Sequence, residues 1–189
     1  MSGVDKREGE VEPFTVWLTG LPCSGKTTLG QGLCSRLMDG FGLASVLLDG
    51  DWIRANLFPE LGFSGRARAK QALRVTIQAH LLNQGGAIAI VALVSPYAKH
   101  HQAARRTLFN FVEVFVDCPP QMCKKRDVKG MWAKAEAGEM TGLTGHESQY
   151  ERPEQPEVIV RSDLQSPTAC VEKILAALVR LGSISGAKE

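Results

Sequence analysis

The sequence contains no apolar run that approaches the ~20 residues a membrane-spanning helix needs. Its first ten residues are polar and charged, and they lack the apolar core of a targeting peptide. The formal net charge is only +2, so nothing indicates broad nucleic-acid binding, and any basic site must be local. We therefore expect a protein that binds neither a membrane nor nucleic acid.

The cysteines do not show the number or spacing of a disulfide framework. The five cysteines are odd in number and none form C-x-x-C: Cys23, Cys34, Cys118, Cys123 and Cys170. This usage predicts reduced thiols in a cytoplasmic protein. Cys23 stands inside a glycine loop, where a small filling side chain is the simpler interpretation and a redox role stays open.

The length and composition predict one globular domain. A chain of 189 residues with 44% hydrophobic residues can bury a real core, but it is short for two domains. We expect a flexible tail over residues 1–12, a single domain over 13–182 and a second tail over 183–189.

The most informative stretch is G-L-P-C-S-G-K-T at Gly20 to Thr27. Its spacing fits the phosphate-binding pattern G-x-x-x-x-G-K-[S/T]. The β-prone run Phe14–Thr19 precedes it and a helical pattern over Lys26–Met38 follows. Strand, glycine loop and helix form the context that turns this loose pattern into a site rather than an ordinary glycine turn.

The chemistry of the loop predicts its ligand. Gly20 and Gly25 allow the dihedrals of a tight loop whose N–H groups form an anion-binding nest, and the helix after it adds its positive dipole end. Lys26 supplies a cation for the outer phosphates, and Thr27 supplies a hydroxyl for Mg²⁺. The expected ATP site comprises Gly20, Leu21, Pro22, Cys23, Ser24, Gly25, Lys26, Thr27 and Thr28.

Strand and helix patterns alternate along the rest of the chain. The expected strands are 44–48, 87–94, 111–116 and 158–160, and the expected helices are 66–83, 96–108, a segment from Pro119, and 167–181. The continuous apolar run over 87–94 suits a strand buried on both faces. Leu73, Ile77 and Leu81 are spaced four apart and predict the apolar face of a helix. The fold class is α/β, a parallel sheet with helices on both faces.

Residues 129–150 stand apart because they hold four glycines, five charges and few large apolar groups. This composition predicts a mobile lid over about 127–150 rather than a plain surface loop, since phosphoryl transfer must exclude water.

Acidic residues follow the expected strands. In open α/β sheets, ligands bind beyond the carboxyl ends of the strands, where Asp49, Asp51 and Asp117 fall. Asp49 and Asp51 point to opposite sides unless Gly50 bends the chain, so we expect one of them to hold the metal through water or to orient an acceptor hydroxyl. The alternative for Asp49 is a turn capped by its side chain.

Two further features point to an acceptor. Ser95 before Pro96 predicts a helix N-cap with proline at the first helical position, while a hydroxyl at the acceptor site, or a site of self-phosphorylation, is the alternative. Arg54 and Arg68 flank Phe63, and together they suit an anionic nucleotide. His100 and His101 are adjacent and point apart on a helix, so we expect no zinc site.

The residues resemble the adenylylsulfate kinases, which use ATP to phosphorylate the ribose 3′-hydroxyl of adenosine 5′-phosphosulfate. The resemblance runs from Phe14 to Ser162. Its blocks are the phosphate loop, L-D-G-D at 48–51, L-G-F-S at 61–64, V-S-P-Y at 94–97, E-V-F-V-D at 113–117, K-R-D-V-K-G at 125–130 and A-G-E-M-T-G-L-T-G at 137–145.

The resemblance implies a P-loop kinase fold and roles for individual residues. Asp51 falls on the acceptor-side carboxylate, Phe63 on an aromatic that stacks on the acceptor's adenine, and Ser95 on a serine labelled a phosphoserine intermediate in bacterial members. The implied acceptor site comprises Asp51, Arg54, Phe63, Arg68, Gln71, Val94, Ser95, Lys129, Leu143, Thr144 and Gly145. We expect catalysis by Lys26, Asp51, Asp49 and Ser95, with Arg126 on the ATP side.

The resemblance also implies a cytoplasmic homodimer and leaves open an association with ATP sulfurylase. The acceptor half departs from the family pattern at Phe58, Ala67, Gln71, Ala98 and Leu143. Three hypotheses follow: an adenylylsulfate kinase, a paralogue acting on another small nucleotidyl acceptor, or a nucleotide-binding regulatory protein without catalysis. For an active kinase we expect direct in-line transfer, with a covalent phosphoserine as the alternative.

Overall fold

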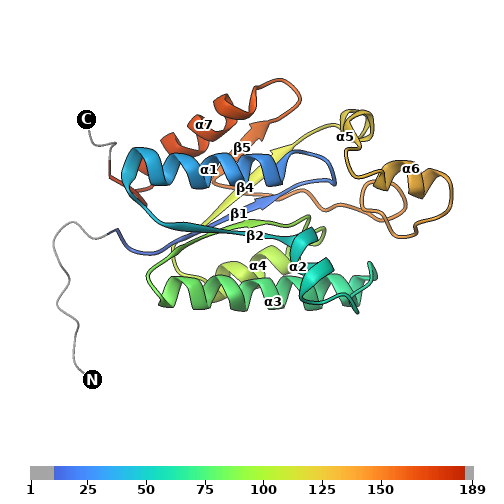
Figure 1. Cartoon of the computed structure of the whole chain (residues 1–189), viewed down its shortest axis with the longest axis horizontal. Helices are drawn as coiled ribbons and strands as arrows, with labels where there is room; N and C mark the ends of the chain where they lie inside the picture. Colours follow the sequence, from blue (N-terminus) through green and yellow to red (C-terminus); the bar gives the residue numbers. More distant parts are fainter. Residues whose placement is uncertain (1–10, 186–189) are drawn as a thin grey trace.

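The computed structural model describes residues 11–185, which fold into a five-stranded parallel sheet with helices on both faces (Figure 1). The strands are β1 (Thr15–Thr19), β2 (Ser45–Asp49), β3 (Ile88–Ala92), β4 (Phe111–Asp117) and β5 (Val158–Arg161). The helices are α1 (Lys26–Phe41), α2 (Gly50–Asn56), α3 (Gly65–Gln84), α4 (Ala98–Thr107), α5 (Pro120–Arg126), α6 (Met131–Glu136) and α7 (Pro167–Arg180). The predicted fold class is confirmed.

The sheet order β2-β3-β1-β4-β5 places β1 at the centre. Val16 on β1 pairs with Ile90 on β3 and with Val112 on β4. Every residue of β1 and of β3 is buried. Strands buried on both faces do not alternate between apolar and polar residues: β3 is apolar throughout, and the threonines at the two ends of β1 are buried as well. After β1 the chain continues to β2 on one side of the sheet, and after β3 it crosses to β4 on the other side of β1. The crevice at such a switch point is where ligands of α/β sheets bind.

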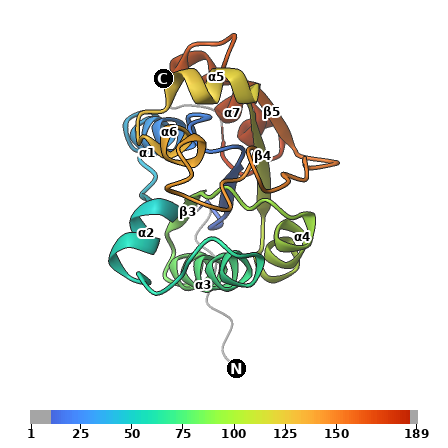
Figure 2. The same ribbon diagram turned by 90° about the vertical axis from the view of Figure 1, so that its right-hand side faces the viewer.

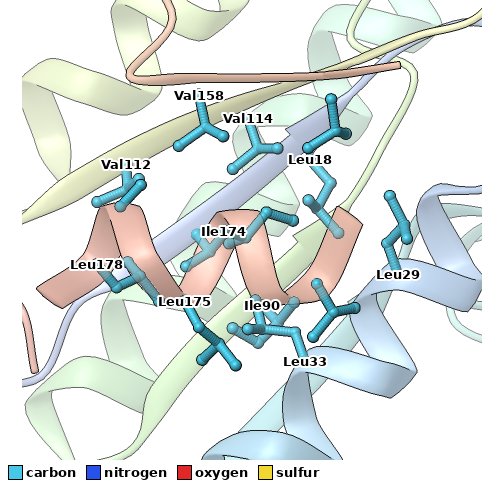
Figure 3. Close-up of a cluster of buried hydrophobic side chains, with 14 of the residues drawn as sticks. Leu18, Leu29, Leu33, Ile90, Val112, Val114, Val158, Ile174, Leu175 and Leu178 are labelled. Atoms are coloured by element: carbon cyan, nitrogen blue, oxygen red, sulfur yellow. The ribbon is translucent and has the colours of Figure 1, made fainter. Parts of the chain in front are cut away.

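Two pairs of helices cover the sheet. Helices α1 and α7 pack on one face, and α3 and α4 pack on the other (Figures 1 and 2). Figure 3 shows the core under α1 and α7, where strand side chains meet helix side chains: Leu18, Ile90, Val112, Val114 and Val158 with Leu29, Leu33, Ile174, Leu175 and Leu178. Each buried aliphatic side chain of this kind stabilises the fold by about 1.5–3 kcal/mol, so the core fixes the strand ends that carry the site.

Helix α3 presents a different face to the sheet than its apolar spacing predicts. Leu73, Ile77 and Leu81 are 61%, 49% and 64% exposed. The side chains that α3 buries instead are Arg68, Gln71, Ala72, Val75, Thr76 and Ala79. The predicted helix is confirmed, but its apolar face points away from the sheet, because small side chains on the other face let α3 lie close to the sheet beside polar groups of the cleft.

The ends of the described chain are packed. Ile184 is 3% exposed and joins the core under α1 and α7, and Val11 packs against the same core. The packed chain thus extends two residues beyond the domain end expected at residue 182. Of the tails expected at either end, residues 1–10 and 186–189 lie outside the described residues. Within residues 11–185, no helix combines the length and apolar character required to cross a bilayer.

The segment expected as a lid contains a short helix and a small core. Helix α6 and the loop that follows it lie beyond the carboxyl ends of the strands (Figures 1 and 2). Trp132, Ala135 and Leu143 are almost fully buried against Leu21 of the glycine loop. The segment is therefore docked on the phosphate loop through apolar contacts that its overall polar composition did not indicate.

Candidate active site at the carboxyl ends of the strands

A cleft of about 750 Å³ opens at the carboxyl ends of the strands. It brings together these sequence-predicted residues: Pro22, Cys23, Gly25, Lys26, Thr27, Thr28, Asp49, Asp51, Arg54, Phe63, Arg68, Gln71, Val94, Ser95, Arg126, Lys129 and Leu143. The five that do not line it are Gly20, Leu21, Ser24, Thr144 and Gly145. Of these, Leu21 and Gly145 line a neighbouring cavity of about 720 Å³ behind the glycine loop.

The glycine loop needs its two glycines for different reasons. Gly20 has φ 155°, and a Cβ there would lie 2.6 Å from the carbonyl oxygen of Val116 on β4. Gly25 has φ 99° and stands in the left-handed region as the N-cap of α1. Both positions therefore exclude larger side chains, and the loop can turn its N–H groups towards a phosphate at the start of α1.

Lys26 is the buried cation of the loop. Its Nζ donates to the carbonyl oxygens of Gly20 (2.9 Å) and Leu21 (2.7 Å) and to Ser24 Oγ (3.4 Å). The side chain is 8% exposed, and burial lowers the pKa of Lys26 to about 8. The ammonium is held by neutral oxygens alone, so a bound phosphate would supply the counter-charge that this position lacks.

Thr27 and Asp49 form the oxygen pair that would face a metal ion. Thr27 Oγ1 donates to Asp49 Oδ2 at 2.6 Å. The other oxygen of Asp49 accepts from the N–H groups of Asp51 and Trp52, both at 3.0 Å, and so caps α2. The capped-turn interpretation of Asp49 is thus correct, and its second oxygen still reaches the phosphate loop. Hydroxyl and carboxylate oxygens are ligands that Mg²⁺ prefers, so these residues fit the ion.

Asp51 lies one residue beyond the bend and turns into the cleft. Because Gly50 starts α2 directly after β2, the two carboxylates both line the cleft instead of pointing to opposite sides. Asp51 Oδ2 is 2.6 Å from Nζ of Lys129, which comes from the expected lid. Gln71 Nε2 donates to the carbonyl oxygen of Gly50 at 2.5 Å and so supports the bend from α3.

The far wall of the cleft carries two cations on one aromatic ring. The guanidinium carbons of Arg54 and Arg68 lie 4.8 and 5.5 Å from the centroid of the Phe63 ring. Arg54 donates to the carbonyl oxygens of Leu61 (2.9 Å) and Gly62 (2.5 Å). Burial lowers the pKa of both arginines, and the charge of Arg54 lowers that of Arg68 further.

Neither arginine has a carboxylate partner within residues 11–185. Arg68 donates only to carbonyl oxygens, those of Phe63 (3.0 Å) and of Gly142 in the expected lid (2.8 Å). Arg54 is half-buried and Arg68 is buried. Two such guanidinium groups without a carboxylate partner, beside an aromatic face, are suited to an anion that carries an aromatic ring.

Ser95 is not the N-cap of a helix. Helix α4 begins at Ala98 with Tyr97 at the N-cap position, so the prediction of a Ser95 cap followed by Pro96 is wrong. Ser95 instead has φ 42°, is 2% exposed, and its Oγ has no hydrogen-bond partner in the described residues. Strand β3 ends at Ala92, and Ser95 lines the cleft. A role for its hydroxyl at the acceptor site stays a prediction.

Arg126 lies at the other end of the cleft. Its guanidinium donates to the carbonyl oxygens of Ser162 (2.5 Å) and Ser24 (3.5 Å). Ser162 Oγ also donates to the carbonyl of Ser24 at 2.8 Å. Arg126 is thus fixed between the glycine loop and the end of β5, beside the outer rim of the phosphate loop.

The rim of the cleft that follows β5 was not predicted from the sequence. The segment after β5 lines the cleft through Ser162, Asp163, Leu164, Gln165, Pro167 and Cys170. The only signal available was its place at the carboxyl end of the last strand, since the segment has no motif of its own. All five cysteines are free thiols, and the described residues contain no group of three or more His, Cys, Asp or Glu side chains that could hold a metal.

The expected lid is tied to the sheet at its far end. The Tyr150 hydroxyl is 2.9 Å from Oγ1 of Thr19, the last residue of β1, and Thr19 Oγ1 donates to the carbonyl of Val94 at 2.8 Å. Tyr150 also stacks on Phe115 with ring centroids 6.1 Å apart. One hydroxyl chain therefore joins the end of the lid, the start of the phosphate loop and the wall that carries Ser95.

The parallel sheet, the glycine loop at its switch point and the two-sided cleft define a P-loop kinase. Residues 12–161 match the protein family Adenylylsulphate kinase. The adenylyl-sulfate kinase of Picosynechococcus sp. is 42% identical over 171 residues, covering 90% of this chain and 96% of the relative. A probable adenylyl-sulfate kinase of Pyrococcus abyssi is 44% identical over 172 residues, covering 91% and 98%.

A solved structure agrees with these relatives. The Mycobacterium tuberculosis APS kinase CysC, in complex with AMPPNP and APS, aligns with a TM-score of 0.84 at 37% identity, covering 88% of this chain and 98% of that one. The chain belongs to the adenylylsulphate kinase family.

Proposed function

We propose that the protein transfers the γ-phosphoryl group of ATP to the ribose 3′-hydroxyl of adenosine 5′-phosphosulfate (APS). The observation that carries this proposal is one cleft with two anion-binding sides. The phosphate loop with Lys26 forms one side, the cations Arg54 and Arg68 around Phe63 form the other, and Asp51 lies between them.

The donor side would hold the triphosphate of ATP. The N–H groups of Gly20 to Thr28 surround the phosphates, and the ammonium of Lys26 leaves its carbonyl partners for the β- and γ-phosphates. Thr27 and Asp49 would hold Mg²⁺, directly or through water, and the ion would neutralise charge on the phosphates. Arg126 together with the segment after β5 would position the adenine of ATP.

The acceptor side would orient the ribose for direct in-line transfer. Phe63 offers a face for the adenine, Arg54 and Arg68 hold the phosphosulfate, and Asp51 orients or deprotonates the 3′-hydroxyl. The remaining acceptor residues of the proposal are Gln71, Val94, Ser95, Lys129 and Leu143. Thr144 and Gly145 follow Leu143 in the chain and do not line the cleft themselves.

The lid proposal concerns residues 127–150. This segment reaches the acceptor side through Lys129 and Gly142, and it reaches the phosphate loop through Leu143. We propose that it opens to admit substrates and closes to exclude water during transfer. A homodimer remains part of the proposal, with the exposed stripe of Leu73, Ile77 and Leu81 on α3 as the surface that a second copy would cover. A cytoplasmic location and an association with ATP sulfurylase stay predictions.

The decisive experiment is an end-point assay with the purified chain. MgATP and APS are mixed with the protein, and ADP and 3′-phosphoadenosine 5′-phosphosulfate are separated by ion-exchange chromatography. We expect the two products in equal amounts and no product with Lys26→Ala. Complete absence of the 3′-phosphorylated product from the wild-type chain would refute the proposed function.

A second candidate keeps the reaction and changes the acceptor. Leu143 lines the same cleft as Phe63, at the position where the resemblance implies a second stacking aromatic. The loss of one stacking contact weakens base binding by ~1–3 kcal/mol. Adenylyl and cytidylyl compounds tested in the same ADP-coupled assay distinguish the two candidates. Higher kcat/KM for any of them than for APS would favour the paralogue.

A further inference from the structure

Ser95 adopts a backbone conformation that its side chain does not favour. It follows β3 with φ 42°, in the left-handed region, and it is 2% exposed. A non-glycine residue remains in this region only where its surroundings hold it there, and such residues concentrate at functional sites. Its hydroxyl is buried without a partner in the described chain, at the wall of the cleft.

The holding contact comes from His101, one turn into α4. The Nε2 atom of its ring contacts the carbonyl oxygen of Ser95. Its Nδ1 atom lies 2.6 Å from Oε1 of Glu113 on β4. The contact with Glu113 is short, although the ring N–H is not aligned for a linear hydrogen bond. His101 and Glu113 are 3% and 5% exposed, so no solvent competes for either contact.

These two contacts hold the ring from both sides. A backbone carbonyl oxygen is only an acceptor, so Nε2 is the atom that carries a proton in the contact with Ser95. The opposite side of the ring lies against Glu113, which limits how the ring can turn.

Glu113 is itself held by its surroundings. Arg105 Nη2 lies 3.3 Å from Oε2 of Glu113, and Arg105 also pairs with Glu157 at 2.6 Å. The N–H of Glu113 donates to Glu157 Oε2 at 2.7 Å. The side chain that lies against His101 is therefore fixed between β4 and α4.

The remaining charged groups near His101 are on α4 and on the segment before β5. Lys99 and His100 are on α4, and Glu151 accepts from the N–H of Ala98 at 2.7 Å. Burial, followed by the charge of Lys99, lowers the pKa of His100. Both ring nitrogens of His100 are buried without partners within residues 11–185. His100 is thus a neutral neighbour with no contact of the kind His101 makes.

We propose that His101 is a positioning residue: its ring, set against Glu113, holds the Ser95 carbonyl and so keeps the Ser95 hydroxyl, unpaired, at the acceptor wall. This inference rests on the proposed function, since the wall matters only if an acceptor binds there. No group of the substrate touches His101. Its effect acts through the Ser95 backbone, and it should therefore concern the acceptor and not ATP.

The kinetic test uses matched substitutions at two adjacent buried histidines. His101→Gln removes the ring that lies between Ser95 and Glu113. We expect kcat/KM for APS to fall roughly 10–100-fold, because the buried carbonyl of Ser95 would lose its partner. The KM for ATP should stay within about twofold, because the phosphate loop is untouched. His100→Gln is the control and should leave both KM values near wild type.

A second measurement uses the wild-type chain and does not depend on activity. Nitrogen-15 NMR of histidine-labelled protein distinguishes protonated from unprotonated ring nitrogens. We expect one buried ring, absent from the spectrum of His101→Gln or of His101→Asn, whose Nε2 carries a proton that exchanges slowly with solvent. If His101→Gln does not fold, His101→Asn supplies the assignment, and an isolated α4 substitution such as Arg106→Ala confirms that the helix tolerates change.

Two results would overturn the proposal. One is a His101 ring whose Nε2 carries no proton. The other is a His101→Gln enzyme whose KM values for ATP and APS rise by the same factor, because that pattern reports general damage to the fold. Failure of the wild-type chain to phosphorylate APS would refute the proposed function instead, and the NMR result would still decide whether Nε2 of His101 donates to Ser95.

Discussion

Nζ of Lys129 lies 2.6 Å from Oδ2 of Asp51, so a residue of the proposed lid is paired across the cleft with the carboxylate proposed to face the acceptor. The two side chains are 47% and 52% exposed, and pairs of this exposure contribute at most about 1 kcal/mol. The contact is therefore weak enough to exchange for a substrate. It places Lys129 where an incoming anion would meet it, and it keeps the carboxylate of Asp51 inside the cleft.

The first prediction concerns this pair. Lys129→Ala should lower kcat/KM for APS by roughly 10–100-fold, since a hydrogen bond to a charged group contributes about 1.5–3 kcal/mol. The melting temperature should hardly change, because the pair is half exposed. Steady-state kinetics and thermal unfolding measure the two effects. Lys134→Ala on α6 is the control. A loss of affinity for ATP equal to that for APS would contradict the assignment of Lys129 to the acceptor.

The second prediction concerns Asp51 itself. Asp51→Asn keeps the shape of the side chain and removes the charge that would orient or accept the proton of the 3′-hydroxyl. We expect kcat to fall about 10²–10⁴-fold, the range for a general base, while AMPPNP still binds. Single-turnover kinetics and calorimetry measure these effects. Asp39→Asn, an exposed position on α1, serves as the control. A kcat close to wild type would remove Asp51 from the chemistry.

The third prediction follows from the pKa of Lys26, which burial lowers to about 8 from an ordinary 10.5. The unfolded chain binds more protons than the native one between these values, so this group makes stability rise with pH across that window. A phosphate beside Lys26 favours the charged form and raises its pKa again. MgATP binding at about pH 8.5 should therefore take up roughly three-quarters of a proton.

Calorimetry in two buffers of different ionisation enthalpy measures that uptake. Near pH 7 it should almost disappear, because Lys26 is then charged in the free protein as well. Binding of MgATP with no proton uptake at the higher pH would show that the ammonium of Lys26 does not approach the phosphates.

The fourth prediction tests the surface of α3. Ile77 is 49% exposed and lies between two exposed leucines, Leu73 and Leu81. If a second copy covers this stripe, Ile77→Lys buries an unpaired charge in the interface and should give a monomer. Light scattering after size-exclusion chromatography measures the mass. Gln84→Lys, near the end of the same helix, should leave a dimer. A wild-type monomer, or a dimer unchanged by Ile77→Lys, would contradict this interface.

Much of the fold could be predicted from the sequence because its signals are local. The segments that became β1 and β3 show no alternation of apolar and polar residues, so central strands were the expected outcome. The glycine loop could be predicted for the same reason, since Gly20 and Gly25 adopt backbone conformations that other residues avoid. The order of strands and helices then predicted the parallel sheet.

Local signals failed where two surfaces could satisfy the same pattern. The spacing of Leu73, Ile77 and Leu81 identifies an apolar stripe, but it does not say whether the sheet or a partner covers it. The neighbouring stripe with Ala72 and Ala79 lies on the sheet because small side chains allow a close approach. Ser95 before Pro96 matched a cap motif, but α4 starts later, so the motif predicted the wrong role.

The sequence by itself determined the donor half of the site, because a phosphate loop is one continuous segment whose residues need no distant partner to form a nest. The resemblance named the residues of the proposed acceptor half, but only the tertiary structure brought them together in one cleft. Arg54, Phe63 and Arg68 come from α2, a loop and α3, and Lys129 comes from the lid. The contact between His101 and Glu113 likewise joins a helix and a strand. Such groups meet because hydrophobic burial fixes the elements that carry them, and that burial is a property of the whole fold.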